Sequence, residues 1–187
     1  MAQVIVFHHA QGLTPGIQAF ADQIRAGGHE VTVPDLYEGK TFSDLDEGVG
    51  YAREVGFDTI GKRAAAAIEG MPSEVVYGGF SLGSSAAQEF TQNRPGALGC
   101  LLYHAGDIPV SEFGSWPDGV PAQVHVAEQD EWVPLKDAQD FVASVPEAEL
   151  FVYPGSAHLF TDSSLPVYDA EATKLVLERS LDFLSRC

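Results

Sequence analysis

The sequence predicts an α/β fold with a single domain, in which a mostly parallel sheet of about six strands carries helices on both faces. The chain has 187 residues, of which 45% are hydrophobic, so one domain with a sizeable core accounts for residues 1–187. Short apolar runs rich in β-branched residues alternate with helical patterns along the chain, which is the rhythm of βαβ crossovers. Most of these runs are apolar on both faces, as strands inside a parallel sheet are.

Apolar runs mark the expected strands, and segments with helical periodicity lie between and after them. The strands are expected at residues 4–7, 30–33, 74–77, 99–104, 123–127 and 149–153, and the helices at 17–24, 58–69, 82–93, 136–144 and 170–184. Gly27 and Gly28 end the first helix and Pro95 ends the third, because neither residue type continues a helix readily.

Two long stretches, residues 37–57 and 107–121, show no clear periodicity and are expected to be irregular. Loops of this length in a compact α/β domain are usually functional and often line a site. For residues 37–57, an ordinary surface excursion is an equally good interpretation. The shape of any pocket therefore depends on segments whose conformation the sequence does not predict.

The charge balance is strongly acidic, with 10 Lys and Arg against 27 Asp and Glu and a formal net charge of -17. Such a chain repels phosphate backbones and anionic bilayers, and it lacks a clustered basic face. We therefore expect neither nucleic acid nor membrane as a partner. No apolar run approaches the roughly 18 residues that cross a bilayer, and the first residues do not resemble a signal peptide, so we expect a cytoplasmic protein. The sequence does not indicate an oligomeric state.

The cysteines and the adjacent histidines of the sequence do not form a pattern typical of a metal or cofactor site. The two cysteines, Cys100 and Cys187, cannot build a disulfide framework and lack the spacing of zinc ligands. His8 and His9 are adjacent, but no carboxylate or cysteine pattern joins them. We expect no cofactor and no metal.

The segment Gly79-x-Ser81-x-Gly83 lies between an apolar strand and a helix rich in small residues. In this setting a serine sits on a tight strand-to-helix turn, with its hydroxyl raised above the sheet as a nucleophile. Glycines flank the serine because the backbone segments approach closely there. The alternative is a glycine-rich turn in which Ser81 only caps the helix.

A serine nucleophile needs a base and an orienting carboxylate, supplied from the carboxyl ends of other strands. Asp130 follows one expected strand and His158 follows the next, so both can reach this edge of the sheet. Asp107 also follows a strand, but Asp130 is favoured because its strand directly precedes the one that leads to His158. The order Ser81, Asp130, His158 is the order found in α/β-hydrolases.

Two further histidines lie in or beside expected strands. His125 is inside a strand and is expected to be a packed core residue. His104 ends a strand at the same edge as Ser81, where lining the site is one interpretation and structural packing the other.

Acyl transfer also needs two donors directed at the oxyanion that forms in the transition state. The backbone N–H of Leu82 follows the nucleophile directly, at the positive end of a helix dipole. The other donor is expected from the loop after the first strand, where the N–H of Ala10 is the best candidate.

With these residues placed, the sequence resembles the dienelactone hydrolase family of α/β-hydrolases over nearly its whole length. The resemblance rests on five stretches: residues 11–13, 33–37 (Val-Pro-Asp-Leu-Tyr), 79–83, 130–134 (Asp-Glu-Trp-Val-Pro) and 153–160 (Tyr-Pro-Gly-Ser-Ala-His-Leu-Phe). It implies a minimal α/β-hydrolase without a cap domain. It also implies a catalytic triad at Ser81, Asp130 and His158, with an oxyanion hole at the N–H groups of Ala10 and Leu82.

Three positions depart from the family's best-known members. Those members have a cysteine nucleophile where this chain has Ser81, a glutamate where it has His9, and a carboxylate-binding arginine where it has Asp162. A carboxylate at position 162 is expected to repel an anionic ligand. The expected substrate is therefore a small neutral or weakly charged ester or lactone, hydrolysed by a serine-dependent mechanism.

Two alternatives remain open at this point. The same three residues could transfer the acyl group to an alcohol or a peroxide instead of water. The departures at His9 and Asp162 also fit a non-catalytic, ligand-binding protein on a hydrolase scaffold, although the intact order of Ser81, Asp130 and His158 favours an enzyme.

Overall fold

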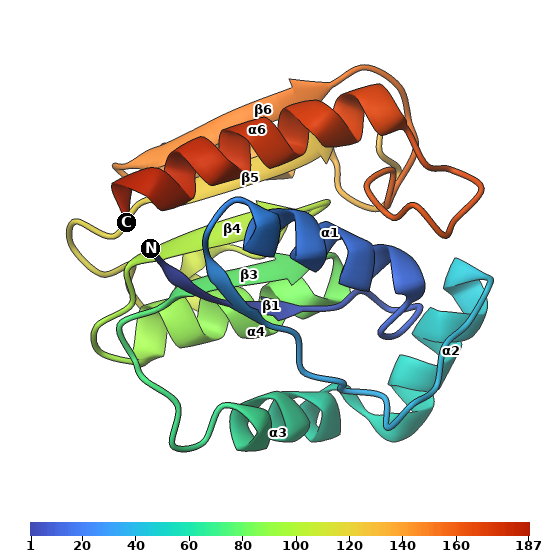
Figure 1. The fold of residues 1–187 in the computed structure, drawn as a ribbon, viewed down its shortest axis with the longest axis horizontal. Coiled ribbons are helices and arrows are strands. Elements are labelled where there is room, and N and C mark those ends of the chain that lie inside the picture. Colours follow the sequence, from blue (N-terminus) through green and yellow to red (C-terminus); the bar gives the residue numbers. More distant parts are fainter.

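A computed structural model describes all of residues 1–187 and contains one parallel sheet (Figure 1). Its six strands are arranged in the order β2-β1-β3-β4-β5-β6, and every neighbouring pair is parallel. The strands are β1 (Gln3–Phe7), β2 (Glu30–Thr32), β3 (Val76–Phe80), β4 (Gly99–Tyr103), β5 (Ala122–Ala127) and β6 (Ala148–Tyr153). Every residue of β3, β4 and β5 is buried, which explains why these strands are apolar on both faces.

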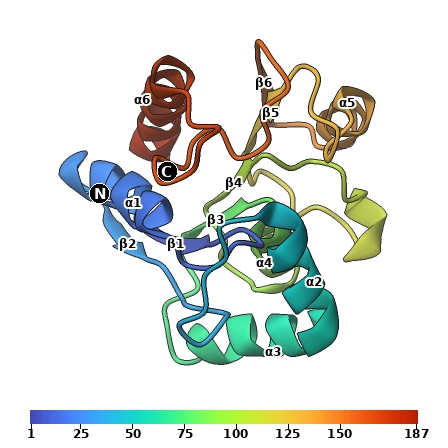
Figure 2. The same ribbon diagram turned by 90° about the vertical axis from the view of Figure 1, so that its right-hand side faces the viewer.

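Helices cover both faces of the sheet, as Figure 2 shows end-on. They are α1 (Pro15–Ala26), α2 (Leu45–Val55), α3 (Phe57–Ala67), α4 (Leu82–Asn93), α5 (Leu135–Ser144) and α6 (Ala170–Arg186), with one short 3₁₀ helix, η1 (Val110–Glu112). Alternate strand residues separate two cores. Val4 and Val6 pack with α1 and α6, whereas Ile5 and Phe7 pack with the helices of the other face. The predicted α/β class is confirmed.

The third strand lies further along the chain than expected. It was expected at residues 74–77 but runs over Val76–Phe80, up to the residue before Ser81. Gly78 and Gly79 lie outside the expected strand, yet they are buried sheet residues. A Cβ atom on Gly79 would lie 2.3 Å from the carbonyl oxygen of Gly83, so glycine is needed where α4 crosses the strand.

The expectation that residues 37–57 are irregular is wrong, because α2 occupies Leu45–Val55. Asp44 caps this helix by accepting a hydrogen bond from the N–H of Glu47 at 3.0 Å, and Asp46 and Glu47 complement the dipole in the first turn. Gly48 obscured the helical pattern. It is needed because a Cβ atom there would lie 2.2 Å from the carbonyl oxygen of Ala10.

The other long stretch, residues 107–121, is irregular apart from η1, and no helix of the structure is long and apolar enough to cross a membrane. Both cysteines are free.

Candidate active site

The turn at Ser81 joins β3 to α4 in a strained conformation. Its φ and ψ angles are 47° and −114°, in a region that non-glycine residues rarely occupy. The backbone holds this geometry by a hydrogen bond from the N–H of Ser81 to the carbonyl oxygen of Tyr103, at 2.9 Å. A Cβ atom on Gly83 would lie 2.3 Å from the carbonyl oxygen of Phe7, so close packing requires the second glycine of the motif. The turn therefore presents the Ser81 hydroxyl at the carboxyl edge of the sheet.

Ser81, His158 and Asp130 form one continuous hydrogen-bonded chain. The Nε2 atom of His158 lies 2.9 Å from Oγ of Ser81, and its Nδ1 atom lies 2.7 Å from Oδ2 of Asp130. The other carboxylate oxygen of Asp130 accepts hydrogen bonds from the N–H groups of Trp132 at 2.9 Å and Val133 at 3.3 Å. The carboxylate is thus held from both sides and fixes the orientation of the imidazole ring.

The three residues come from loops that follow β3, β5 and β6, at the edge where ligands bind in open parallel sheets. Asp107, the rival carboxylate, follows β4 and makes no hydrogen bond to His158. The structure therefore brings Asp130 rather than Asp107 to the histidine.

A cavity of about 350 Å³ opens over the Ser81 hydroxyl, and we call it the nucleophile cavity. It is lined by Ala10, Val49, Ala52, Phe57, Ser81, Leu82, Ser84, Ser85, His104, Asp107, Ile108, Trp132, Val133 and His158. No Lys or Arg side chain contributes to this lining, and Asp107 is its only carboxylate.

Both expected oxyanion donors border this cavity. The N–H of Ala10 makes no hydrogen bond within the protein. Leu82 is the first residue of α4, where backbone N–H groups have no partner inside the helix. The loop that carries Ala10 is supported from behind by α2, through the close contact with Gly48.

Sequence reasoning missed the contribution of α2 to the nucleophile cavity. Val49 and Ala52 of this helix form part of the wall. The signal that could have revealed the helix is the pair Asp44 and Glu47, three residues apart, which is a common pattern at helix N-termini.

His104 lines the cavity in a fully buried position. Its φ angle is 52°, its Nε2 atom lies 2.7 Å from Oγ1 of Thr161, and its Nδ1 atom has no partner. Burial, followed by the nearby His158, His9 and His125, lowers the pKa of His104 well below its usual value. His104 is thus a neutral imidazole beside the proposed base, with ring centroids 5.7 Å apart. His125 is a fully buried sheet residue, as expected.

His9 and Asp162, two of the departures noted above, form a buried pair. Nε2 of His9 lies 2.8 Å from Oδ2 of Asp162, which also accepts a hydrogen bond from the Thr14 hydroxyl at 2.5 Å. Oδ1 of Asp162 accepts from the N–H and hydroxyl of Ser164, at 2.8 Å and 2.5 Å. Burial alone raises the pKa of Asp162, but the hydrogen bonds from His9, Ser164 and Thr14 outweigh it and hold that pKa below its usual value.

The position of Asp162 corrects the expectation that it faces the substrate. Its side chain is fully buried and does not line the nucleophile cavity, so it repels no ligand there. No group of three or more His, Cys, Asp or Glu side chains is placed to hold a metal ion.

A strained serine between a central strand and a helix, facing a histidine–carboxylate pair at the carboxyl edge of a parallel sheet, defines an α/β-hydrolase. More particularly, the chain belongs to the dienelactone hydrolase family, whose model matches residues 1–187. The enzymes of this family hydrolyse carboxylic esters, and the chain is one of these hydrolases.

Solved structures of related proteins share the fold at low sequence identity. A dienelactone hydrolase-like promiscuous phosphotriesterase from metagenomic libraries has a TM-score of 0.76 and 19% identity, with 100% of this chain and 86% of that chain covered. Dienelactone hydrolase from Anabaena variabilis has a TM-score of 0.72 and 15% identity, with coverages of 100% and 86%. A cold-adapted esterase from an Arctic intertidal metagenomic library has a TM-score of 0.70 and 17% identity, with coverages of 99% and 82%. No curated protein matches the sequence.

Proposed function

We propose that the protein is a serine-dependent hydrolase of small carboxylic esters or lactones, with Ser81 as the nucleophile, His158 as the general base and Asp130 as the carboxylate that orients it. The observation that carries the proposal is the unbroken chain from Oγ of Ser81 to Nε2 of His158 at 2.9 Å, and from Nδ1 of His158 to Asp130 at 2.7 Å. This is the geometry that activates a serine hydroxyl, which is a weak nucleophile without an adjacent base.

In the acylation step, Oγ of Ser81 attacks the ester carbonyl while Nε2 of His158 removes the hydroxyl proton. The carbonyl oxygen becomes an oxyanion that accepts hydrogen bonds from the N–H groups of Ala10 and Leu82. The bond to the leaving oxygen then breaks, His158 returns the proton to that oxygen, and the alcohol departs from an acyl-serine. Asp130 stabilises the imidazolium that exists between these proton transfers.

In the deacylation step, His158 removes a proton from water, and the resulting hydroxide attacks the acyl carbon of Ser81. The second tetrahedral intermediate is stabilised by the same two N–H groups. Its collapse breaks the bond to Oγ, returns the proton to Ser81 and releases the carboxylic acid. With a lactone, the alcohol and the acid belong to one molecule, so the product is a hydroxy acid.

The nucleophile cavity supports a substrate that is uncharged around its reacting carbonyl. Its volume of about 350 Å³ fits a small ligand, and its lining holds no Lys or Arg to bind a carboxylate. Trp132 and Phe57 stand at its rim with exposed fractions of 45% and 55%, and they give the mouth an apolar surface.

The proposed role of Ser81 is tested by labelling with a fluorophosphonate, read by intact mass and peptide mapping. We expect one adduct per chain on Ser81, with hydrolysis of p-nitrophenyl acetate lost in proportion, because only an activated serine reacts with this probe. The variant Ser81→Ala is the control and should fold normally, take up no probe and lose turnover. Turnover by Ser81→Ala at the level of the parent protein would refute the proposal.

A further inference from the structure

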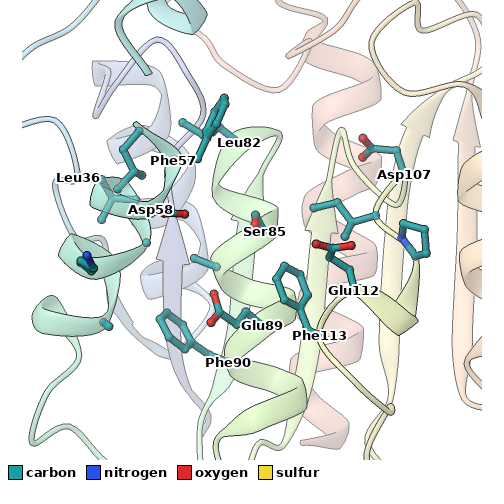
Figure 3. A pocket seen from close by; sticks show the side chains of 17 residues that line it. Leu36, Phe57, Asp58, Leu82, Ser85, Glu89, Phe90, Asp107, Glu112 and Phe113 are labelled. Atoms are coloured by element: carbon teal, nitrogen blue, oxygen red, sulfur yellow. The ribbon is translucent and has the colours of Figure 1, made fainter. Parts of the chain in front are cut away.

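A second and larger cavity continues from the nucleophile cavity. It encloses about 750 Å³ between α3, α4 and the segment from Asp107 to Phe113, and we call it the distal groove (Figure 3). The two cavities share five lining residues: Phe57, Leu82, Ser85, Asp107 and Ile108. A ligand bound at Ser81 therefore has a continuous path into the distal groove.

The floor of the distal groove is apolar. It is formed by Leu36, by Ile60 of α3, and by Ala86 and Phe90 of α4, all of which are buried. A methylene chain lying on this floor would remove apolar surface of both the chain and the protein from water, which favours binding. The groove thus suits a flexible, unbranched chain.

Carboxylates surround this apolar floor. Asp58 of α3, Glu89 of α4, Asp107 and Glu112 all line the groove, against Lys62 as the only cationic side chain. No Lys, Arg or His nitrogen lies within 4.0 Å of any of the four carboxylates, so none of them is neutralised by the protein. At Asp107, partial desolvation, together with the charges of Asp137 and Asp130, raises the pKa of the carboxyl group. Unpaired carboxylates beside an apolar surface favour a ligand that brings a positive charge.

Helix α4 sets the distance between the nucleophile and these carboxylates. Ser81, Ser85 and Glu89 follow at intervals of four residues, so they lie along one side of the helix. A helix rises about 1.5 Å per residue, which puts Glu89 roughly 12 Å along the axis from Ser81. In Figure 3, Leu82 and Asp107 lie toward one end of the groove, Ser85 lies between, and Glu89 and Phe90 lie toward the other end.

The groove is on the acyl side of the scissile bond. His158 must protonate the leaving oxygen, so the alcohol part lies next to His158 and its neighbour Trp132. Neither residue lines the distal groove, whereas Leu82, a proposed oxyanion donor, lines both cavities. The acyl chain is therefore the part of the substrate that points along α4.

We propose that the distal groove binds the acyl chain of a substrate that ends in a cationic group, such as an ammonium or quaternary ammonium, roughly 12 Å from the scissile carbonyl. This inference rests on the proposed serine hydrolase activity and names its substrate class. Glu89 and Glu112 are the specificity-determining carboxylates, and the carbonyl end stays in the nucleophile cavity, where Asp107 is the only lining carboxylate. The reacting part of the substrate is neutral, and its far end is positive.

The test compares two series of p-nitrophenyl esters of graded chain length, at low ionic strength. One series ends in a trimethylammonium group, and the other ends in the uncharged tert-butyl group of the same shape. We expect kcat/KM to favour the cationic ester by roughly threefold to fivefold at the chain length that reaches Glu89, and by much less at shorter lengths. The dependence on length separates binding in the groove from a general attraction to an acidic protein, which acts on every cationic ester alike.

The variants Glu89→Gln and Glu112→Gln should reduce the preference for the cationic ester, mainly through KM. Glu178→Gln is the matched control, because it removes one negative charge from α6 on the opposite face of the sheet. It should leave the preference unchanged. A cationic preference that is absent, independent of chain length or equally reduced by Glu178→Gln would overturn the inference, as would a preference confined to esters of cationic alcohols.

Failure of this inference is distinguishable from failure of the proposed function. If p-nitrophenyl acetate is hydrolysed and Ser81 is labelled, but no chain-length-dependent cationic preference appears, only the substrate class is refuted. If neither labelling nor turnover is observed, the hydrolase proposal itself fails.

Discussion

Two buried histidine–carboxylate pairs lie at the same edge of the sheet, and they differ in which ring nitrogen holds the carboxylate. His158 contacts Asp130 through Nδ1 at 2.7 Å, so its Nε2 atom faces Oγ of Ser81. His9 contacts Asp162 through Nε2 at 2.8 Å, and its Nδ1 atom accepts the N–H of Gln11 at 3.2 Å. A histidine–carboxylate pair therefore indicates general-base chemistry only where the second nitrogen is free to accept a proton from a hydroxyl group or from water.

The second pair connects loops that the proposed mechanism needs to hold together. His9 belongs to the loop that carries Ala10, and Asp162 belongs to the segment that follows His158. Thr14, which also binds Asp162, is the N-cap of α1. Asp162 thus fastens the start of α1 and the Ala10 loop to the segment of the base. Its effect on catalysis is indirect, through position.

Of the substitutions that would break either pair, Asp130→Asn is expected to have the largest effect, and that effect is on kcat. An amide at this position cannot stabilise the imidazolium and favours the wrong tautomer of His158, so kcat should fall by about 10³–10⁴-fold. The thermal midpoint should change little, because the amide oxygen can still accept the N–H groups of Trp132 and Val133. Steady-state kinetics with p-nitrophenyl acetate measure this. A loss of less than tenfold would show that the pair does not act as a catalytic unit.

Acidification tests two other buried histidines, His8 and His125, which lie outside the two pairs. Burial lowers the pKa of His8 to about 4 and that of His125 to about 3, whereas an unfolded histidine has a pKa near 6.5. The unfolded state therefore binds more protons below pH 6.5, and stability falls as the pH decreases toward these folded values. Between pH 6.5 and 5, the two residues should together cost on the order of 3 kcal/mol in the free energy of unfolding.

Urea unfolding at several pH values measures this loss, and His125→Gln is the informative variant. Its stability should depend less steeply on pH than that of the parent protein between pH 6.5 and 5. An identical slope in the two proteins would show that His125 does not remain neutral in the folded state.

The smallest effect is expected from Asp162→Asn, which keeps the shape of the second pair and removes its charge. We expect a loss of about 1–3 kcal/mol in the free energy of unfolding at pH 7, because hydrogen bonds to a buried charged acceptor are weakened. The pKa of Asp162 is lowered in the folded protein, so its contribution is present above the unfolded pKa and disappears as the pH falls through the folded value.

The difference in stability between Asp162→Asn and the parent protein should therefore shrink in strong acid, as urea titrations at pH 7 and pH 3 would measure. The variant should retain most of its kcat. A fall in kcat as large as that of Asp130→Asn would contradict the distinction between the two pairs.

Local patterns predicted the parts of the site that depend on local geometry. The glycines around Ser81 and the strands that end before Asp130 and His158 are encoded within a few residues, and chain order then places the three side chains at one edge. The pairing of His9 with Asp162 joins residues 153 positions apart and follows no local pattern. The distal groove follows no local pattern either, because its walls depend on how α3 and the segment after β4 pack against α4.

Because all six strands are parallel, the chain termini and the proposed active site lie at opposite edges of the sheet. The N-terminus begins β1, and the C-terminus follows α6, which runs back along the sheet, so both lie at the edge away from the strand ends that carry Ser81 (Figure 1). A tag or tether at either terminus would therefore be attached at the edge of the sheet opposite Ser81. When the protein is attached to a solid support through either terminus, the opening of the nucleophile cavity would face the solution.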